Sequence, residues 1–142
     1  MIRMKKNLLQ EFADSVYQEK ENLLEFWLKN SVDEHYGGFY GKVSVANEAQ
    51  SEADKALILN SRILWSFANA YREDKNPDYL KMADRAYDYL VAKFEDKKYS
   101  GFYWLLDYKG EAKDKKKQIY GQAFCLYAFS EYYRATDNED AL

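Results

Sequence analysis

The sequence repeats itself with a period of about 62 residues. Gly-Phe-Tyr at residues 38–40 recurs at residues 101–103. With an offset of 62, residues 63–80 align without gaps to residues 125–142, and polar positions match as well, such as Asn76 with Asn138. Two unrelated amphipathic helices would share apolar spacing but not these polar residues. We therefore infer a structural duplication.

Each unit is predicted to contain two helices. Residues 51–54 (Ser-Glu-Ala-Asp) resemble a capping box, and the apolar positions of residues 56–72 keep one helical face. Pro77 is a typical first helical residue, and helical spacing continues from it to about residue 95. The second helix is expected to pack back on the first.

Short β arms are predicted to follow the helices. Residues 101–108 alternate in polarity and end in a Lys-Gly turn at residues 109–110, which favours a strand or hairpin arm. Residues 39–45 are expected to form the same arm of the first unit. Ahead of it, residues 7–29 predict an outer helix with one apolar side.

Helix-pair repeats bury their apolar faces on neighbouring repeats. This chain of 142 residues holds little more than two units, and Leu142 aligns with Leu80, which lies in the first turn of a predicted helix. We expect the chain to be the N-terminal part of a larger protein. The open edge would expose an apolar face, so self-association is also expected.

Charge and composition exclude several classes of function. The formal net charge of −3 provides no basic field for nucleic acid or anionic lipid. No apolar run approaches the roughly 18 residues of a membrane helix, and no signal peptide is evident, so a cytoplasmic location is expected. With one cysteine (Cys125) and one histidine (His35), neither an internal disulfide nor a zinc cluster is expected.

The chain resembles the N-acylglucosamine 2-epimerase superfamily, most closely its cellobiose 2-epimerases. The matching segments follow in order along nearly the whole chain: residues 37–41 (Gly-Gly-Phe-Tyr-Gly), 54–55, 59–65 (Leu-Asn-Ser-Arg-Ile-Leu-Trp), 101–104, 117–124 and 132–135. The resemblance implies an all-α fold of helix-hairpin repeats with short β-hairpin arms, forming part of an (α/α)6 barrel. Residues 1–142 would be the N-terminal portion of that single barrel domain.

The resemblance also implies a reaction. Such enzymes invert C2 of the reducing-end sugar of a β-1,4-linked disaccharide such as cellobiose, through ring opening and a cis-enediol, with no cofactor and no metal. Two groups that titrate near neutrality must move the C2 proton. The family's acid and base histidines lie in later repeats, and His35 does not match them, so this chain alone is expected to be inactive.

Two residues carry family roles at matching positions. Arg62 matches the arginine that reaches the reacting end of the sugar, where a guanidinium can stabilise enediolate charge. Tyr120 matches a tyrosine that lines the same pocket. The structural alternatives are an arginine paired with a carboxylate and a packed tyrosine whose hydroxyl is satisfied.

Further candidates rest on the repeat and on the aromatic residues, which make up 18% of the chain. Asn60 and Gln122 are equivalent under the offset and are candidates to point into the barrel, although amides near helix starts often bind backbone instead. Trp65 and Phe124 are candidate pocket walls, with core packing the main alternative for Trp65. Aromatic faces stack well on sugar rings.

Other functions remain open at this stage. An aldose–ketose isomerase of the same barrel would share the enediol and return the proton to C1. A non-catalytic carbohydrate-binding or helical interaction module would also explain the aromatic excess. A glycoside hydrolase would need a carboxylate pair at fixed separation, and the spacing of the available residues identifies none.

Overall fold

The computed structural model describes the backbone of residues 2–142 and the side chains of residues 7–142. The helices are α1 (Ile2–Asn30), α2 (Leu57–Asp74), α3 (Pro77–Tyr89) and α4 (Ile119–Thr136). Short elements complete the chain: β1 (Lys55–Ala56), a π-helical turn (Leu90–Phe94), β2 (Leu105–Leu106), β3 (Ala112–Asp114) and a 3-10 turn (Glu139–Ala141). The fold is therefore all-α with short β elements, as predicted, and its three strands form an antiparallel sheet in the order β1-β2-β3.

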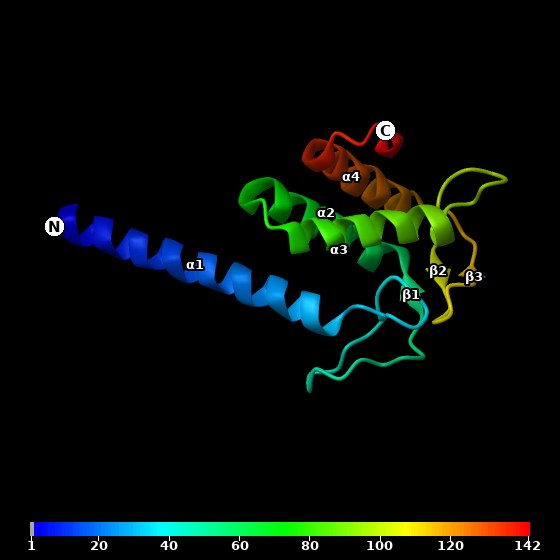
Figure 1. The fold of residues 1–142 in the computed structure, drawn as a ribbon, viewed down its shortest axis with the longest axis horizontal. Helices are drawn as coiled ribbons and strands as arrows, with labels where there is room; N and C mark the ends of the chain where they lie inside the picture. The colour runs from blue at the N-terminus through cyan, green and yellow to red at the C-terminus, as the bar shows by residue number, and fades with distance from the viewer. Residues whose placement is uncertain (1) are drawn as a thin grey trace.

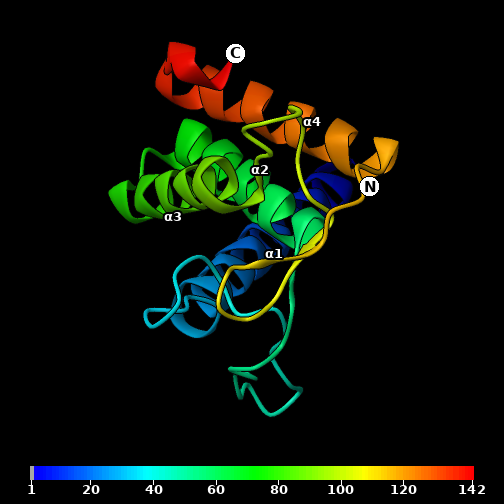
Figure 2. The same cartoon turned by 90° about the vertical axis from the view of Figure 1, so that its right-hand side faces the viewer.

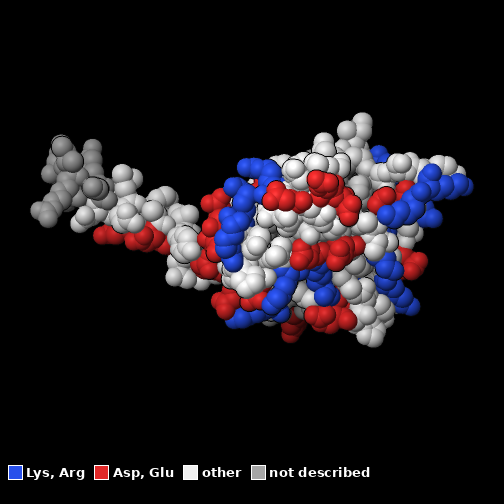
Figure 3. All heavy atoms as spheres, turned by 45° about the horizontal axis from the view of Figure 1, so that its top comes forward, with Lys and Arg blue, Asp and Glu red and all other residues white. Residues whose placement is uncertain are grey.

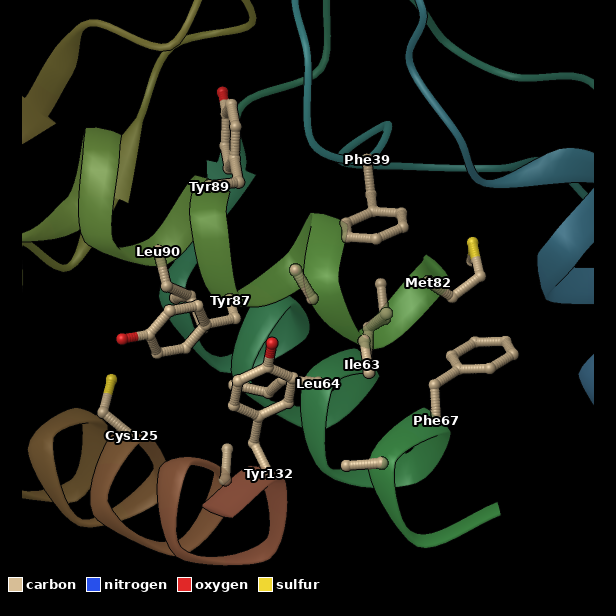
Figure 4. Close-up of a cluster of buried hydrophobic side chains, with 14 of the residues drawn as sticks. Phe39, Ile63, Leu64, Phe67, Met82, Tyr87, Tyr89, Leu90, Cys125 and Tyr132 are labelled. Carbon is tan, nitrogen blue, oxygen red and sulfur yellow. The ribbon is translucent and has the colours of Figure 1, made fainter. Parts of the chain in front are cut away.

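The core lies between three helices. Helix α2 packs on both α3 and α4, and Figures 1 and 2 show the three helices gathered beside the loops. The rings of Tyr87 from α3 and Tyr132 from α4 stack at 4.6 Å between their centroids (Figure 4). Leu64 and Phe67 of α2 are almost fully buried in the same cluster. Burial of one such side chain contributes about 1.5–3 kcal/mol.

The duplication predicted from the sequence is visible in the helix ends. Helices α2 and α4 both end in a left-handed residue, Lys75 and Asp137, whose N–H donates to the carbonyl four residues earlier. Asn76 and Asn138 follow, and each accepts the backbone N–H two residues on. The polar positions that repeat in the sequence are therefore helix stops and starts.

Two local predictions are wrong. Residues 51–54 do not cap α2, because α2 begins only after β1, with Ala56 as N-cap and no side-chain bond. Residues 39–45 form no strand, only isolated bridges that pair Phe39 with Val32 and Val43 with Ala49. The alternating polarity of residues 39–45 suggested a longer paired strand. Backbone hydrogen bonds within the loop, such as those from Ser44 to Glu48 and from Gln50 to Lys42, are present instead. The predicted hairpin arm at residues 101–110 is present, because β2 pairs antiparallel with β3 across the turn that contains Gly110, although β2 is only two residues long.

Helix α1 extends away from the remainder of the molecule (Figure 1). Its C-terminal half is attached by Lys20, which binds Asp74 at 2.6 Å, and by Glu21, which accepts the hydroxyl of Tyr79. Acidic and basic side chains are interspersed over the face shown in Figure 3. No described helix is long and apolar enough to cross a membrane.

Candidate functional site

A groove of about 780 Å³ lies between the C-terminal half of α1 and α2. Its walls are mostly apolar and come from both helices, and they include Leu23, Leu24, Trp27, Leu59, Ile63 and Phe67. Arg62 and Trp65, both predicted site residues, line the same groove. The structure therefore brings together the predicted charged residue and one predicted aromatic wall.

Arg62 lies in the second turn of α2 and is exposed. Within residues 7–142, no hydrogen bond or ion pair involves its guanidinium group. The carboxylate pairing considered as the structural alternative is therefore not present among these residues. An unengaged guanidinium beside an apolar wall is able to bind sugar oxygens or a carboxylate from outside the described chain.

Tyr120 and Phe124 lie one turn apart on α4, and their rings meet edge to face at 4.9 Å. Tyr120 is 60% exposed, so its ring is not packed into the core. Trp65 stacks on Tyr127 at 5.1 Å and links the two helices. The predicted aromatic residues thus lie on α2 and α4 and are at least partly exposed, but of the three only Trp65 lines the groove.

The amides of Asn60 and Gln122 are engaged with backbone. Gln122 accepts the N–H of Phe102 and donates to its carbonyl, both at 2.8 Å. Asn60 is fully buried and donates to the carbonyl of Ala56 at 2.9 Å. Its Oδ1 has no partner among the described residues. The structure therefore gives Gln122 the structural role that the sequence left as the alternative, and it leaves only Oδ1 of Asn60 free.

Sequence reasoning missed a buried ion pair beside the Gly-Gly turn. The ammonium of Lys55 binds Asp33 at 2.7 Å and the carbonyl of Gly37 at 2.6 Å, and both charged side chains are only 1% exposed. Arg85 of α3 donates to the carbonyls of Asp33 and Gly38. Three charged groups therefore fix the first turn against the start of α2.

The pKa of the Asp33 carboxyl is set by its burial and by its hydrogen-bond donors. Burial would raise the pKa of Asp33, but the hydrogen bonds from Lys55 and from two backbone N–H groups outweigh it and hold that pKa below its usual range. The sequence did carry a signal for the pair. Asp33 recurs as Asp96 and Lys55 as Lys117, at the offsets of the repeat.

Tyr89 connects the loops around this turn. Its ring lies against Gly37 and Gly38, and its hydroxyl lies against Gly110 of the β2–β3 turn. In Figure 4 its ring points away from the middle of the core cluster. Burial raises the pKa of its hydroxyl to about 12, and that hydroxyl has no partner among the described residues.

The remaining candidates have ordinary structural positions. His35 is an exposed turn residue whose N–H donates to Asp33. Cys125 is buried and free, and burial raises its pKa to about 11. Among the described residues, no three histidine, cysteine, aspartate or glutamate side chains gather as a metal site would require.

Known proteins with similar sequences identify the family. Residues 38–141 match the profile of N-acylglucosamine 2-epimerase (GlcNAc 2-epimerase). The chain belongs to the N-acylglucosamine 2-epimerase family. A cellobiose 2-epimerase from Bacteroides fragilis is 45% identical over 120 residues, which cover 84% of this chain and 31% of the relative. The chain thus spans about a third of the length of such relatives.

Solved structures agree with the fold. The cellobiose 2-epimerase structure from Bacillus thermoamylovorans B4167 superposes with a TM-score of 0.82 at 41% identity, covering 90% of this chain and 34% of that one. A more distant relative, a D-mannose isomerase from Marinomonas mediterranea, is 26% identical over 110 residues. The chain is a fragment of the epimerase (α/α)6 barrel, and its elements correspond to the helix pairs predicted from the repeat.

Proposed function

We propose that this chain is the N-terminal portion of the single barrel domain of a cytoplasmic sugar 2-epimerase. The reaction is inversion at C2 of the reducing-end sugar of a β-1,4-linked disaccharide such as cellobiose. The observation that carries this proposal is the free, exposed guanidinium of Arg62 on an apolar groove, in a chain 45% identical to a cellobiose 2-epimerase. The buried free cysteine is compatible with a reducing compartment.

The chemistry assigns a role to each exposed site residue. Removal of the C2 proton places negative charge on the sugar oxygens, and a fixed guanidinium at Arg62 stabilises that charge. Tyr120 offers a hydroxyl for a sugar oxygen, while Trp65 and Phe124 offer apolar ring faces. The proton-transfer histidines belong to repeats outside this sequence, so the isolated chain is expected to be inactive. It is also expected to self-associate through its exposed apolar edges.

A chimeric enzyme tests the proposal. This chain would replace the matching segment of the Bacteroides fragilis relative, and conversion of cellobiose to glucosyl-mannose would be followed by chromatography. Arg62→Met is expected to lower kcat/KM by about 10²–10³, with Arg62→Lys between, as for other lost oxyanion donors. Lys97→Met, which removes an exposed pair with Glu95, is the control and should leave the rate unchanged. Full activity of Arg62→Met would exclude the role.

The same chimera separates the competing reactions. In D₂O, a cis-enediol route places one deuterium at C2 of the epimer. A ketose product would instead favour the aldose–ketose isomerase, which the D-mannose isomerase relative makes a specific second candidate. Epimerisation by the isolated chain would contradict the fragment proposal. A flat titration of the isolated chain with cello-oligosaccharides would remove the carbohydrate-binding module.

A further inference from the structure

Gln122 of α4 binds the backbone of the second loop in the way that a neighbouring β-strand would. Its side-chain amide accepts the N–H of Phe102 and donates to the carbonyl of the same residue, both at 2.8 Å. On the other edge of this segment, residues 101–103 bond to residues 94–96. The ring of Phe102 also packs on Phe129, seven residues after Gln122 on α4, at 5.4 Å between the centroids. The loop segment is therefore attached to α4 at two places.

Trp104, two residues after Phe102, connects the same segment to α2. Its carbonyl accepts the N–H of Leu57, the first residue of α2, at 3.1 Å. Its ring lies beside Gly121 of α4, where an added Cβ would lie 2.9 Å from Leu57 and 3.3 Å from Trp104. Residues 102–104 therefore bind the first turns of both α2 and α4 and hold the two turns together.

The first turn of α4 is not held by a side-chain cap in the described part of the chain. Gln118 is the N-cap, and its side chain makes no capping hydrogen bond. Tyr120 is the second residue of the helix and is 60% exposed, and its ring contacts Phe124 on the same helix. An uncapped helix start frays more readily than a capped one. The position of Tyr120 relative to α2 therefore depends on the bonds of Gln122 and on the close approach at Gly121.

The repeat shows that these amide bonds are not needed to build such a loop. Under the offset of 62, Gln122 corresponds to Asn60, and under the offset of 63, Phe102 corresponds to Phe39. Asn60 instead donates to the carbonyl of Ala56, next to its own helix. Among the described residues, no side-chain amide binds the backbone of Phe39. The second loop therefore carries an additional attachment, at the helix turn where a candidate site residue lies.

We propose that Gln122 is a positioning residue of the sugar site. Through Phe102 and Trp104, it fixes the turn that carries Tyr120 against α2. Helix α2 carries Arg62, so the separation between its guanidinium and the hydroxyl of Tyr120 is set before a sugar binds. Two groups at a fixed separation bind one ligand without a further ordering cost. The inference rests on the proposed sugar-binding role of Tyr120, and it goes beyond that role because Gln122 itself binds backbone and no sugar.

Hydrogen–deuterium exchange of this chain tests the attachment without any sugar. Gln122→Met keeps the length of the side chain but removes both bonds to Phe102. The N–H of Phe102 and the amides of residues 122–125 should then exchange at least about fivefold faster, the factor for one lost net hydrogen bond. Gln50→Met, the same change at an exposed loop position, is the matched control and should leave both segments unchanged. Unchanged exchange of both segments in Gln122→Met would overturn the positioning role.

A double-mutant cycle in the chimeric enzyme tests the link to Tyr120. Tyr120→Phe removes the hydroxyl and is expected to lower kcat/KM for cellobiose about fivefold. Gln122→Met should lower it by a similar factor, and the double variant should be no worse than either single variant, because the displaced hydroxyl is already lost. Gln50→Met is again the control and should leave the rate unchanged.

The outcomes of the cycle separate this inference from the proposed function. Losses that multiply in the double variant would overturn the positioning role, because Gln122 would then act independently of Tyr120. If Tyr120→Phe leaves an active chimera unchanged, the sugar role of Tyr120 is wrong and the inference falls with it, while the reaction itself stands. An inactive parent chimera would overturn the proposed function, and the exchange measurement would still decide whether Gln122 fixes the first turn of α4.

Discussion

Two loops of the molecule have the same backbone design but different surroundings. The first loop comprises residues 31–55 and the second residues 94–117. In each, an aspartate, Asp33 or Asp96, accepts two N–H groups of a tight turn, and a bridge residue pairs with a phenylalanine. In each, a lysine just before the next long helix, Lys55 before α2 and Lys117 before α4, binds that aspartate at 2.7 Å.

The difference lies in the burial of the ion pair. Lys55 and Asp33 are both 1% exposed, whereas Lys117 is 29% exposed beside an 8% exposed Asp96. The second loop gains a neutral clamp instead, since Gln122 binds both backbone groups of Phe102. Repeated geometry therefore does not imply repeated energetics, because the cost of losing a charge partner depends on burial.

The largest effect is expected at Lys55. Lys55→Met leaves the carboxylate of Asp33 buried without its charge partner, which should destabilise the fold by about 3–5 kcal/mol. Lys117→Met, the matched change in the second loop, should cost far less because water reaches that pair. Urea unfolding followed by circular dichroism measures both. Equal losses for the two variants would contradict the comparison.

The next effect is expected at Gly38, which has φ of +64°. A Cβ there would lie 2.6 Å from the ring of Tyr89, so Gly38→Ala adds steric overlap to the cost of a left-handed residue, about 1–2 kcal/mol. At Gly101, with φ of +77°, the Cβ would meet the flexible end of Gln122 at 2.9 Å. Gly101→Ala should therefore cost less than Gly38→Ala, namely the conformational part and some weakening of the hydrogen bonds between Gln122 and Phe102. Melting temperatures rank the two, and a larger drop for Gly101→Ala would refute the steric argument.

Lowering the pH is expected to have a smaller effect on stability, through the second ion pair, Lys117–Asp96. The hydrogen bond from Lys117, aided by two backbone N–H groups, lowers the pKa of Asp96 from 3.8 to about 2. A lowered pKa stabilises the fold above the unfolded value, and this contribution is lost as pH falls from about 4 to about 2. Lys117→Met should thus differ from wild type at pH 5 and converge with it near pH 2. Thermal melts across this range test it, with Lys97→Met as the control.

The sequence predicted the repeating part of the fold well. The helical spacing of apolar residues in 7–29, 56–72 and 77–95 correctly located the helices α1 to α3. This spacing is informative because the apolar side of an amphipathic helix is the side that becomes buried. The sequence also predicted the β2–β3 hairpin but overestimated the arm at residues 39–45, since alternation also occurs in loops held by turn bonds and isolated bridges. The capping box failed for a similar reason: β1 intervenes before α2 begins.

The candidate site was only partly predictable. Motif position selected Arg62 and Tyr120 as candidates; both are exposed, and their binding roles stay predictions. The amide of Gln122 could not be assigned, because the choice between a ligand and the backbone of Phe102 depends on a loop 20 residues away. The Asp33–Lys55 pair was overlooked although both residues recur in the repeat as Asp96 and Lys117, because the sequence does not show that two residues 22 positions apart are buried together.

The smallest effect, and the one that connects both loops, is expected at Tyr89, which lies between Gly38 of the first loop and Gly110 of the second. Its buried hydroxyl has no described partner, so Tyr89→Phe should be neutral or slightly stabilising at pH 7. Tyr87→Phe is the matched control, since that hydroxyl donates to the carbonyl of Asp140 and its loss should cost about 1 kcal/mol.

Alkaline titration sharpens this last prediction. Burial raises the pKa of Tyr89 from 10.0 to about 12, so the folded state binds this proton more tightly than the unfolded state does. Wild type therefore loses stability between pH 10 and 12 through this group, whereas Tyr89→Phe does not. The stability of the variant relative to wild type should rise across this interval. A constant difference would show that the hydroxyl is hydrated, and the contact between the two loops would then be looser than the structure indicates.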